Sequence, residues 1–254
     1  MNIQSKIIKD AFHLSLRQFH LTSSYVLLYS YTSINRLLEY NNIISIMVYH
    51  YLNLMFVGLG FLLIPGVLFL LYWKSINPNN TLSFKSYIEA EKKYIGVYFK
   101  TAIWLAIVAT MFYIPYFIYV IFDSSPLASP YSMQTLIITV INMVFTTIFY
   151  IFTFFTLPAI YSDNKAGLPA VLFSFSFVRK NFKRIKMFMW VIVLKYVLGV
   201  ILVFLRFSYG YSQIYWLFNF VLYIFDRYID VILFLIGVQV LINPVFRAEQ
   251  VNNE

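Results

Sequence analysis

Three long runs without a charged residue constrain this chain more than any other feature. They cover residues 51–73, 101–122 and 135–162, and each is apolar over nearly all of its length. A helix needs roughly 20 apolar residues to cross the hydrocarbon core of a bilayer. Only 11% of all residues are charged, whereas a soluble domain carries about 25%. Because so few polar side chains could not cover a globule, the pattern predicts an integral membrane protein built from helices.

The apolar pattern predicts an all-α, polytopic transmembrane bundle with six spans. We place these spans at about 21–38, 46–73, 97–122, 135–161, 187–207 and 215–242. The first is the weakest, because several serines and threonines and Arg36 interrupt it. The second is long, so it must tilt or begin in the interface.

Lysine and arginine predict the orientation of the spans. The loops after the second and fourth spans, 74–100 and 162–186, hold five lysines and six basic residues respectively, while those after the third and fifth hold none. Cytoplasmic loops carry the excess of basic residues, so the first two loops are predicted to lie inside. The basic segment 1–20 would then lie outside unless 21–38 also crosses. We therefore expect both termini to be cytoplasmic, in an inner or plasma membrane.

Proline motifs and amphipathic segments together predict three repeated units. The motifs centre on Pro65, Pro158 and Pro244, and each follows an apolar run. The amphipathic segments precede the first, third and fifth spans, at about 6–19, 83–96 and 165–186. Each unit would be an amphipathic helix followed by a transmembrane hairpin. Chance remains the alternative, since proline is tolerated in transmembrane helices.

The third amphipathic segment is the most basic, and it carries candidate lipid-headgroup contacts. These residues are Arg179, Lys180, Lys183, Arg184 and Lys186. A helix with one apolar and one basic face lies in the headgroup plane, where each basic residue attracts anionic lipid by about 1 kcal/mol. Plain topological anchoring is the simpler interpretation of the same residues.

Residues 157–186 combine a proline at a span end, a polar turn with Gly167, and a segment with Ser174 and Arg179-Lys180-Asn181. This pattern resembles a group of bacterial and archaeal six-span membrane proteins that is similar to the membrane domain of some glycerophosphodiester phosphodiesterases. The resemblance implies six spans and cytoplasmic termini, but little function, since the group is largely uncharacterised. The chain departs from the pattern after Asn243, where a Tyr-Asp-Arg-like exit is expected.

No motif in the sequence predicts catalysis, a metal site or a cofactor. The three histidines, His13, His20 and His50, have no partners at metal-ligand spacing, and there is no cysteine. Gly58 and Gly60 lie inside an apolar span, and no Gly-Lys-Ser/Thr follows them. We therefore expect a non-enzymatic protein with anionic membrane lipids as partners, a membrane protein as a further partner option, and no nucleic acid.

Five charges inside the last two spans are the most informative residues. They are Lys195, Arg206, Asp226, Arg227 and Asp230. Each costs roughly 2.5–3.5 kcal/mol on insertion scales, so such side chains usually face the bundle interior and pair. In an antiparallel hairpin, Arg206 comes level with Asp226, and Lys195 reaches toward Asp230.

This cluster leaves three functions open. Salt bridges that fix the hairpin register would favour a scaffold, accessory subunit or lipid-interacting protein, which is our first hypothesis. A polar pathway would favour a transporter or permease-like protein for a small or lipidic substrate. An intramembrane enzyme would need Asp226 and Asp230 to face a cavity, and it is the least supported. A contact closed to water favours the first, and an accessible cavity favours transport.

Overall fold

The computed structural model describes residues 3–40, 45–80, 83–122, 133–209 and 213–246, and these residues contain helices but no strand. The helices are α1 (Ile3–Arg17), α2 (Phe19–Tyr40), α3 (Ile46–Ile76), α4 (Phe84–Phe122), α5 (Met133–Thr153), α6 (Thr156–Ser162), α7 (Leu168–Tyr209) and α8 (Gln213–Ile242). The prediction of an all-helical chain is therefore confirmed for the described residues.

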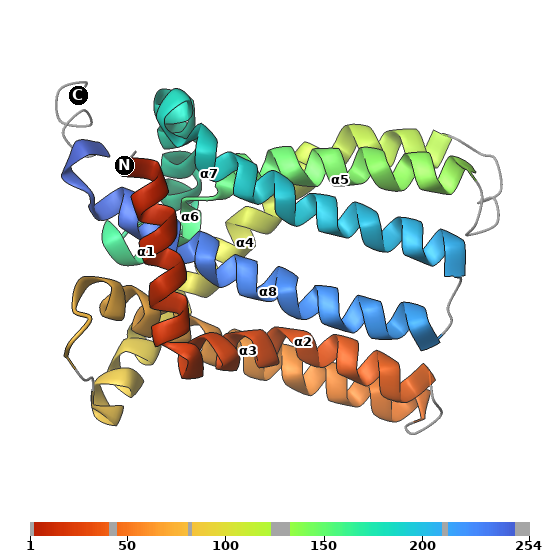
Figure 1. Ribbon diagram of the computed structural model, residues 1–254, viewed down its shortest axis with the longest axis horizontal. Coiled ribbons are helices and arrows are strands. Elements are labelled where there is room, and N and C mark those ends of the chain that lie inside the picture. The colour runs from red at the N-terminus through yellow and green to blue at the C-terminus, as the bar shows by residue number, and fades with distance from the viewer. Residues whose placement is uncertain (1–2, 41–44, 81–82, 123–132, 210–212, 247–254) are drawn as a thin grey trace.

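Helices α2, α3, α4, α5 and α8, together with the second part of α7, run along the length of the bundle (Figure 1). Helix α2 packs against α3 and α8, α3 packs against α4, and α7 packs against α5 and α8. The last turns of α2, α4 and α7 lie at the same end of the bundle as the first turns of α3, α5 and α8. The start of α1 and the last turn of α8 lie at the opposite end.

Three helical segments of the described chain are long and apolar enough to cross a membrane. They are Ile46–Ile76, Lys85–Ile114 and Ile137–Ser162. Large apolar side chains point outward along them, such as Leu54 at 75% exposure and Met111 at 65%. Contact of such surface with water is unfavourable by about 25 cal/mol per Å². By length and composition, these helices indicate a membrane protein.

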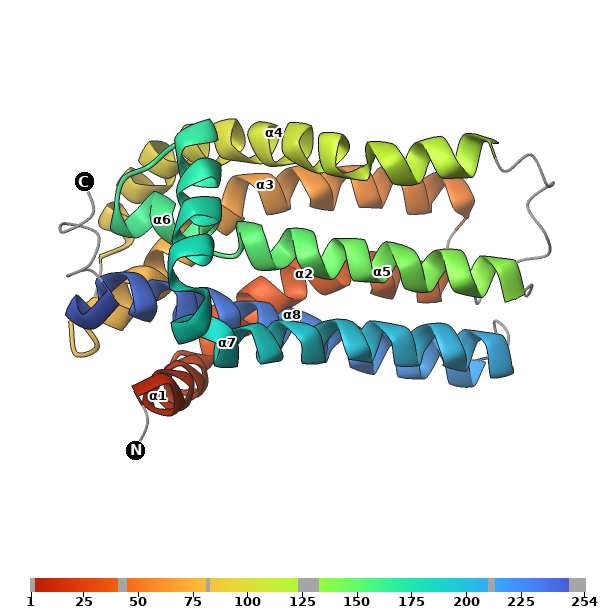
Figure 2. The same cartoon turned by 90° about the horizontal axis from the view of Figure 1, so that it is seen from above.

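Two predicted amphipathic segments continue into the next predicted span without interruption. Helix α4 joins 83–96 to 97–122, and α7 joins 165–186 to 187–207. No proline stands at either predicted boundary, and a continuous helix keeps every backbone amide in its hydrogen-bond ladder. Helix α7 nevertheless bends: its first part stands across the bundle axis and its second part follows it (Figure 2).

The three proline motifs have three different effects on the backbone. Pro65 lies inside α3, the break between α5 and α6 comes just before Pro158, and α8 ends two residues before Pro244. Proline lacks an amide hydrogen and clashes with the preceding turn, so each motif can interrupt a helix in its own way. Because the backbone does not repeat uniformly at these motifs, the three repeated units stay a prediction.

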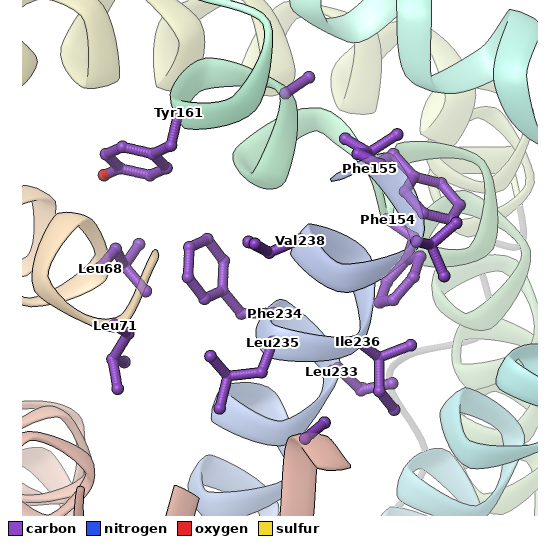
Figure 3. Close-up of a cluster of buried hydrophobic side chains, with 14 of the residues drawn as sticks. Leu68, Leu71, Phe154, Phe155, Tyr161, Leu233, Phe234, Leu235, Ile236 and Val238 are labelled. Carbon is purple, nitrogen blue, oxygen red and sulfur yellow. The ribbon is translucent and has the colours of Figure 1, made fainter. Parts of the chain in front are cut away.

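The second half of α8 is the centre of the packed core. All residues from Asp230 to Val238 are buried, as expected for a helix surrounded by others. Figure 3 shows Phe234 and Val238 between the side chains of α3 and the aromatic residues that follow α5. The core therefore fixes the second half of α8, directly after the helical turn that carries charged residues.

Ser174 at the start of α7 bridges the break between α5 and α6. Its hydroxyl accepts a hydrogen bond from the Phe155 amide at 3.0 Å and donates one to the Phe152 carbonyl at 2.7 Å. Ser174 is fully buried. Backbone groups at an interrupted helix lack helical partners, so this side chain satisfies two groups that could not reach water.

Helix α8 passes α6 closely at Gly237. A Cβ atom at this position would lie 2.6 Å from Cγ of Pro158, and a proline ring has little freedom to move aside. We expect Gly237→Ala to lower the free energy of unfolding by about 1–3 kcal/mol, as overpacking does. Thermal unfolding of the purified protein in mild detergent measures this loss.

Gly96→Ala is the matched control for that substitution, because a Cβ there would meet nothing within 4 Å. It should leave the melting temperature unchanged or raise it, since alanine favours helix over glycine by up to about 1 kcal/mol. Equal melting temperatures for the two variants would contradict the close approach at Gly237.

Candidate functional site

Four charged side chains of α7 and α8 meet within the bundle. The Lys195 ammonium pairs with Oδ1 of Asp230 and lies 3.7 Å from Oδ1 of Asp226. The Arg227 guanidinium lies 2.8 Å from Oδ2 of Asp226 and 2.9 Å from Oδ2 of Asp230. Two cations therefore face two carboxylates, and the charge cluster, as we name these four residues, has no net charge.

The cluster is largely buried. The side chains of Lys195 and Asp230 are each 8% exposed, whereas those of Asp226 and Arg227 are 22% and 23% exposed. An unpaired charge in a medium of low dielectric constant is very costly, and a partner with good geometry offsets that cost. Lys195 pairs with both carboxylates from the facing helix, and Arg227 pairs with both from their own helix.

Aromatic rings surround the cluster and tie α5 to it. The Tyr150 hydroxyl of α5 donates to Oδ1 of Asp230 at 3.2 Å, and the Lys195 ammonium lies 4.9 Å from the Tyr150 ring centroid. Arg227 lies over the Tyr223 ring at 4.8 Å. Cation–π contacts of this kind strengthen when water is excluded. The cluster thus connects three helices, α5, α7 and α8.

Helical spacing explains why these charges converge. Asp226 and Asp230 are four residues apart and share a face of α8. Lys195 of the facing α7 reaches both carboxylates, and Arg227 contacts the same pair from within α8. The local sequence therefore creates an acidic face, which Arg227 of α8 and Lys195 of the packed α7 neutralise together.

The structure brings together four of the five charged residues that the sequence singles out. The expected approach of Lys195 to Asp230 is present. The side chain of Arg206 falls outside the described ones, so its pairing with Asp226 stays a prediction; Asp226 has Lys195 and Arg227 as partners. Tyr150 is a further member of this site that the sequence pattern does not indicate. A buried phenol usually has a hydrogen-bond partner, but its position alone does not identify which one.

The candidate lipid-headgroup residues lie on the outer side of the first part of α7. All five, Arg179, Lys180, Lys183, Arg184 and Lys186, are exposed. On the same part of α7, Phe177, Val178, Ile185 and Phe188 are buried. The helix therefore turns its apolar side to the bundle and its basic side outward, at the end of the molecule where it stands across the bundle axis (Figure 2).

Described residues line cavities at two places that lie apart from the charge cluster. One, of about 520 Å³, lies between α1 and the end of α8. The other, of about 490 Å³, is lined by α2, α3 and α4 and is mostly apolar. Neither includes a residue of the charge cluster. Within the described parts of the chain, no group of three or more His, Cys, Asp or Glu residues could hold a metal ion.

Comparison with known proteins gives no relative that could guide the interpretation of this site. No protein-family model, no curated protein and no solved structure matches the chain. The resemblance of residues 157–186 to the six-span group therefore stays a prediction, and the functional argument depends on the geometry alone.

Proposed function

We propose that this chain is a six-span membrane protein without enzymatic activity, which acts as a scaffold or accessory subunit and binds anionic lipid at its cytoplasmic face. The arrangement of the long helices supports six spans, since successive helix ends alternate between the two ends of the bundle (Figure 1). This topology would leave both termini cytoplasmic, in line with the basic residues of 74–100 and 162–186.

The charge cluster explains how α7 and α8 can cross a bilayer despite their charges. The insertion cost of roughly 2.5–3.5 kcal/mol per charge applies to an unpaired side chain that faces lipid. Here the two cations and two carboxylates neutralise one another between the two helices. The pair can therefore insert as a hairpin whose register the cluster fixes.

The closed pairing of the cluster is the observation that carries the proposal. A transport pathway or a catalytic centre needs polar groups that can exchange partners with a substrate. Lys195 and Asp230 are instead buried against each other, and Tyr150 closes the same carboxylate from α5. This geometry favours a structural role for the cluster. We therefore expect the protein to bind lipid or partner proteins at its surfaces.

Transport by a permease-like mechanism remains the second candidate, and one observation favours it. Asp226 and Arg227 keep about a fifth of their side-chain surface exposed, so a polar substrate could contact them. Copurification in mild detergent followed by mass spectrometry separates the two proposals. A stoichiometric protein partner supports the accessory role, whereas a single enriched small molecule bound to an otherwise lone chain supports transport.

The lipid part of the proposal predicts a specific loss on substitution. Replacement of the five candidate lipid-headgroup residues of α7 by glutamine should weaken binding of phosphatidylglycerol at least tenfold, because each contributes about 1 kcal/mol. Native mass spectrometry with titrated lipid measures this affinity.

The matched control replaces Lys85, Lys92, Lys93 and Lys100 of α4 by glutamine, since these residues are also exposed. We expect a smaller loss for this control, because the basic residues of α7 are concentrated within 179–186, whereas the lysines of α4 are spread over 85–100. An equal loss in both variants would indicate attraction by net charge alone and contradict a lipid-binding surface on α7.

A further inference from the structure

The cavity between α1 and the end of α8 combines groups of opposite charge with an apolar wall. Its polar lining comes from Lys6 and Asp10 of α1 together with Gln239 and Asn243 at the end of α8. Isoleucines from both helices complete it. Its volume of about 520 Å³ is within the range of small-molecule sites, roughly 300–1,000 Å³.

The cavity exists because α1 meets α8 along one side only. Ala11 and Ser15 of α1 are fully buried, and the Ser15 hydroxyl lies 2.9 Å from that of Tyr228 on α8. Helix α1 runs steeply across the bundle axis (Figure 1). The chain turns away after Ile242, where the Asn243 side chain accepts a hydrogen bond from the Val245 amide at 3.0 Å. These constraints leave space beside the first turns of α1.

Gln239, which lines this cavity, carries an acceptor without a partner among the described residues. The Oε1 atom of Gln239 is buried and has no hydrogen-bond donor among the described residues. A buried polar atom without a partner loses about 1–3 kcal/mol of solvation. A bound ligand or water with an N–H or O–H donor would satisfy it.

The side chains define the chemistry of a matching ligand. Lys6 supplies a cation for a phosphate, whereas the Asp10 carboxylate and Gln239 Oε1 supply acceptors for an amine that carries hydrogen atoms. Lys6 and Asp10 are one helical turn apart, so the two ligand charges would be a few bonds apart. A phosphoethanolamine group carries both charges at this spacing and has N–H donors. A phosphocholine group has the same spacing, but its quaternary nitrogen carries no hydrogen to donate.

We propose that this cavity binds the headgroup of phosphatidylethanolamine from the inner leaflet. The inference depends on the proposed membrane topology, in which α1 lies at the level of the cytoplasmic headgroups. The isoleucines of the wall would then contact the glycerol and the first carbons of the acyl chains. Bound lipid would hold α1 against α8 at the cytoplasmic end of the bundle.

Native mass spectrometry of the detergent-purified protein tests the proposal by separate titration with phosphatidylethanolamine and phosphatidylcholine. Wild-type protein should bind the first roughly tenfold more tightly, the difference expected for a hydrogen-bonded charge. Asp10→Asn and Gln239→Leu should each reduce this preference. Lys6→Gln should weaken the binding of both lipids, because both carry the phosphate. Lys9→Gln, on the same helix but outside the cavity, should change neither.

Three results would overturn the proposal. They are equal affinity of wild-type protein for the two lipids, an unchanged preference in Asp10→Asn and Gln239→Leu, and binding of free phosphoethanolamine as tight as that of the lipid. Gln239→Leu removes an oxygen without a protein partner, so its melting temperature should not fall, and loss of lipid binding would not reflect unfolding. Failure here with the expected phosphatidylglycerol result on α7 would leave the proposed function intact.

Discussion

Asp230→Asn should largely abolish recovery of folded protein, because Lys195 would keep a buried charge without its closest carboxylate. Removal of one partner of a buried ion pair costs about 3–5 kcal/mol, and a domain has only about 5–15 kcal/mol of stability. The partial contact of Lys195 with Asp226 at 3.7 Å would not replace the lost pair. The fraction of monodisperse protein on size-exclusion chromatography, together with the melting temperature, measures the effect.

The double variant Lys195→Met with Asp230→Asn should recover most of this loss. It removes one charge of each sign and leaves the pair of Asp226 and Arg227, which lie 2.8 Å apart. A double-mutant cycle should give a coupling energy of at least about 2 kcal/mol between Lys195 and Asp230. Glu89→Gln on the exposed face of α4 controls for loss of a carboxylate alone and should be neutral. Additive losses in the double variant would contradict a structural ion pair.

Ser174→Ala should lower the free energy of unfolding by about 2–4 kcal/mol. The substitution removes one acceptor for the Phe155 amide and one donor for the Phe152 carbonyl. Each backbone group left unsatisfied in a buried position costs about 1–3 kcal/mol. Thermal unfolding in mild detergent measures the change.

Ser176→Ala provides the comparison, since Ser176 is exposed on the same helix. It should change the free energy of unfolding by no more than about 0.5 kcal/mol, the range of ordinary surface substitutions. Similar losses at both positions would mean that the break between α5 and α6 does not depend on Ser174. Ser174→Thr keeps a hydroxyl and should retain part of the stability if the extra methyl group fits.

Sequence reasoning could predict the class of the protein and one contact of the charge cluster. The uncharged runs require helices that avoid water, and the structure contains three such segments. The contact of Lys195 with Asp230 follows from helical rise in a tight hairpin. Both inferences depend on the helical period and on the length of the uncharged runs, and the local sequence determines both.

Other features depend on contacts between distant segments, and local sequence does not determine them. The break before Pro158 is stabilised by a hydroxyl that comes from Ser174, on another helix. Tyr150 joins the cluster only because α5 packs against α7. The continuity of α4 and α7 also differs from the predicted division into separate segments, because a change of composition does not by itself end a helix.

Cysteine accessibility tests the alternation of loops between the two sides in the proposed topology most directly, because the chain has no natural cysteine. Single substitutions at Asn80, Asn164, Ser125 and Ser212 would each report on one loop, labelled with a membrane-impermeant maleimide. Ser125→Cys and Ser212→Cys should react in intact cells, whereas Asn80→Cys and Asn164→Cys should react only after permeabilisation. Labelling of all four positions in intact cells, or of Ser125 and Asn80 from the same side, would contradict the topology.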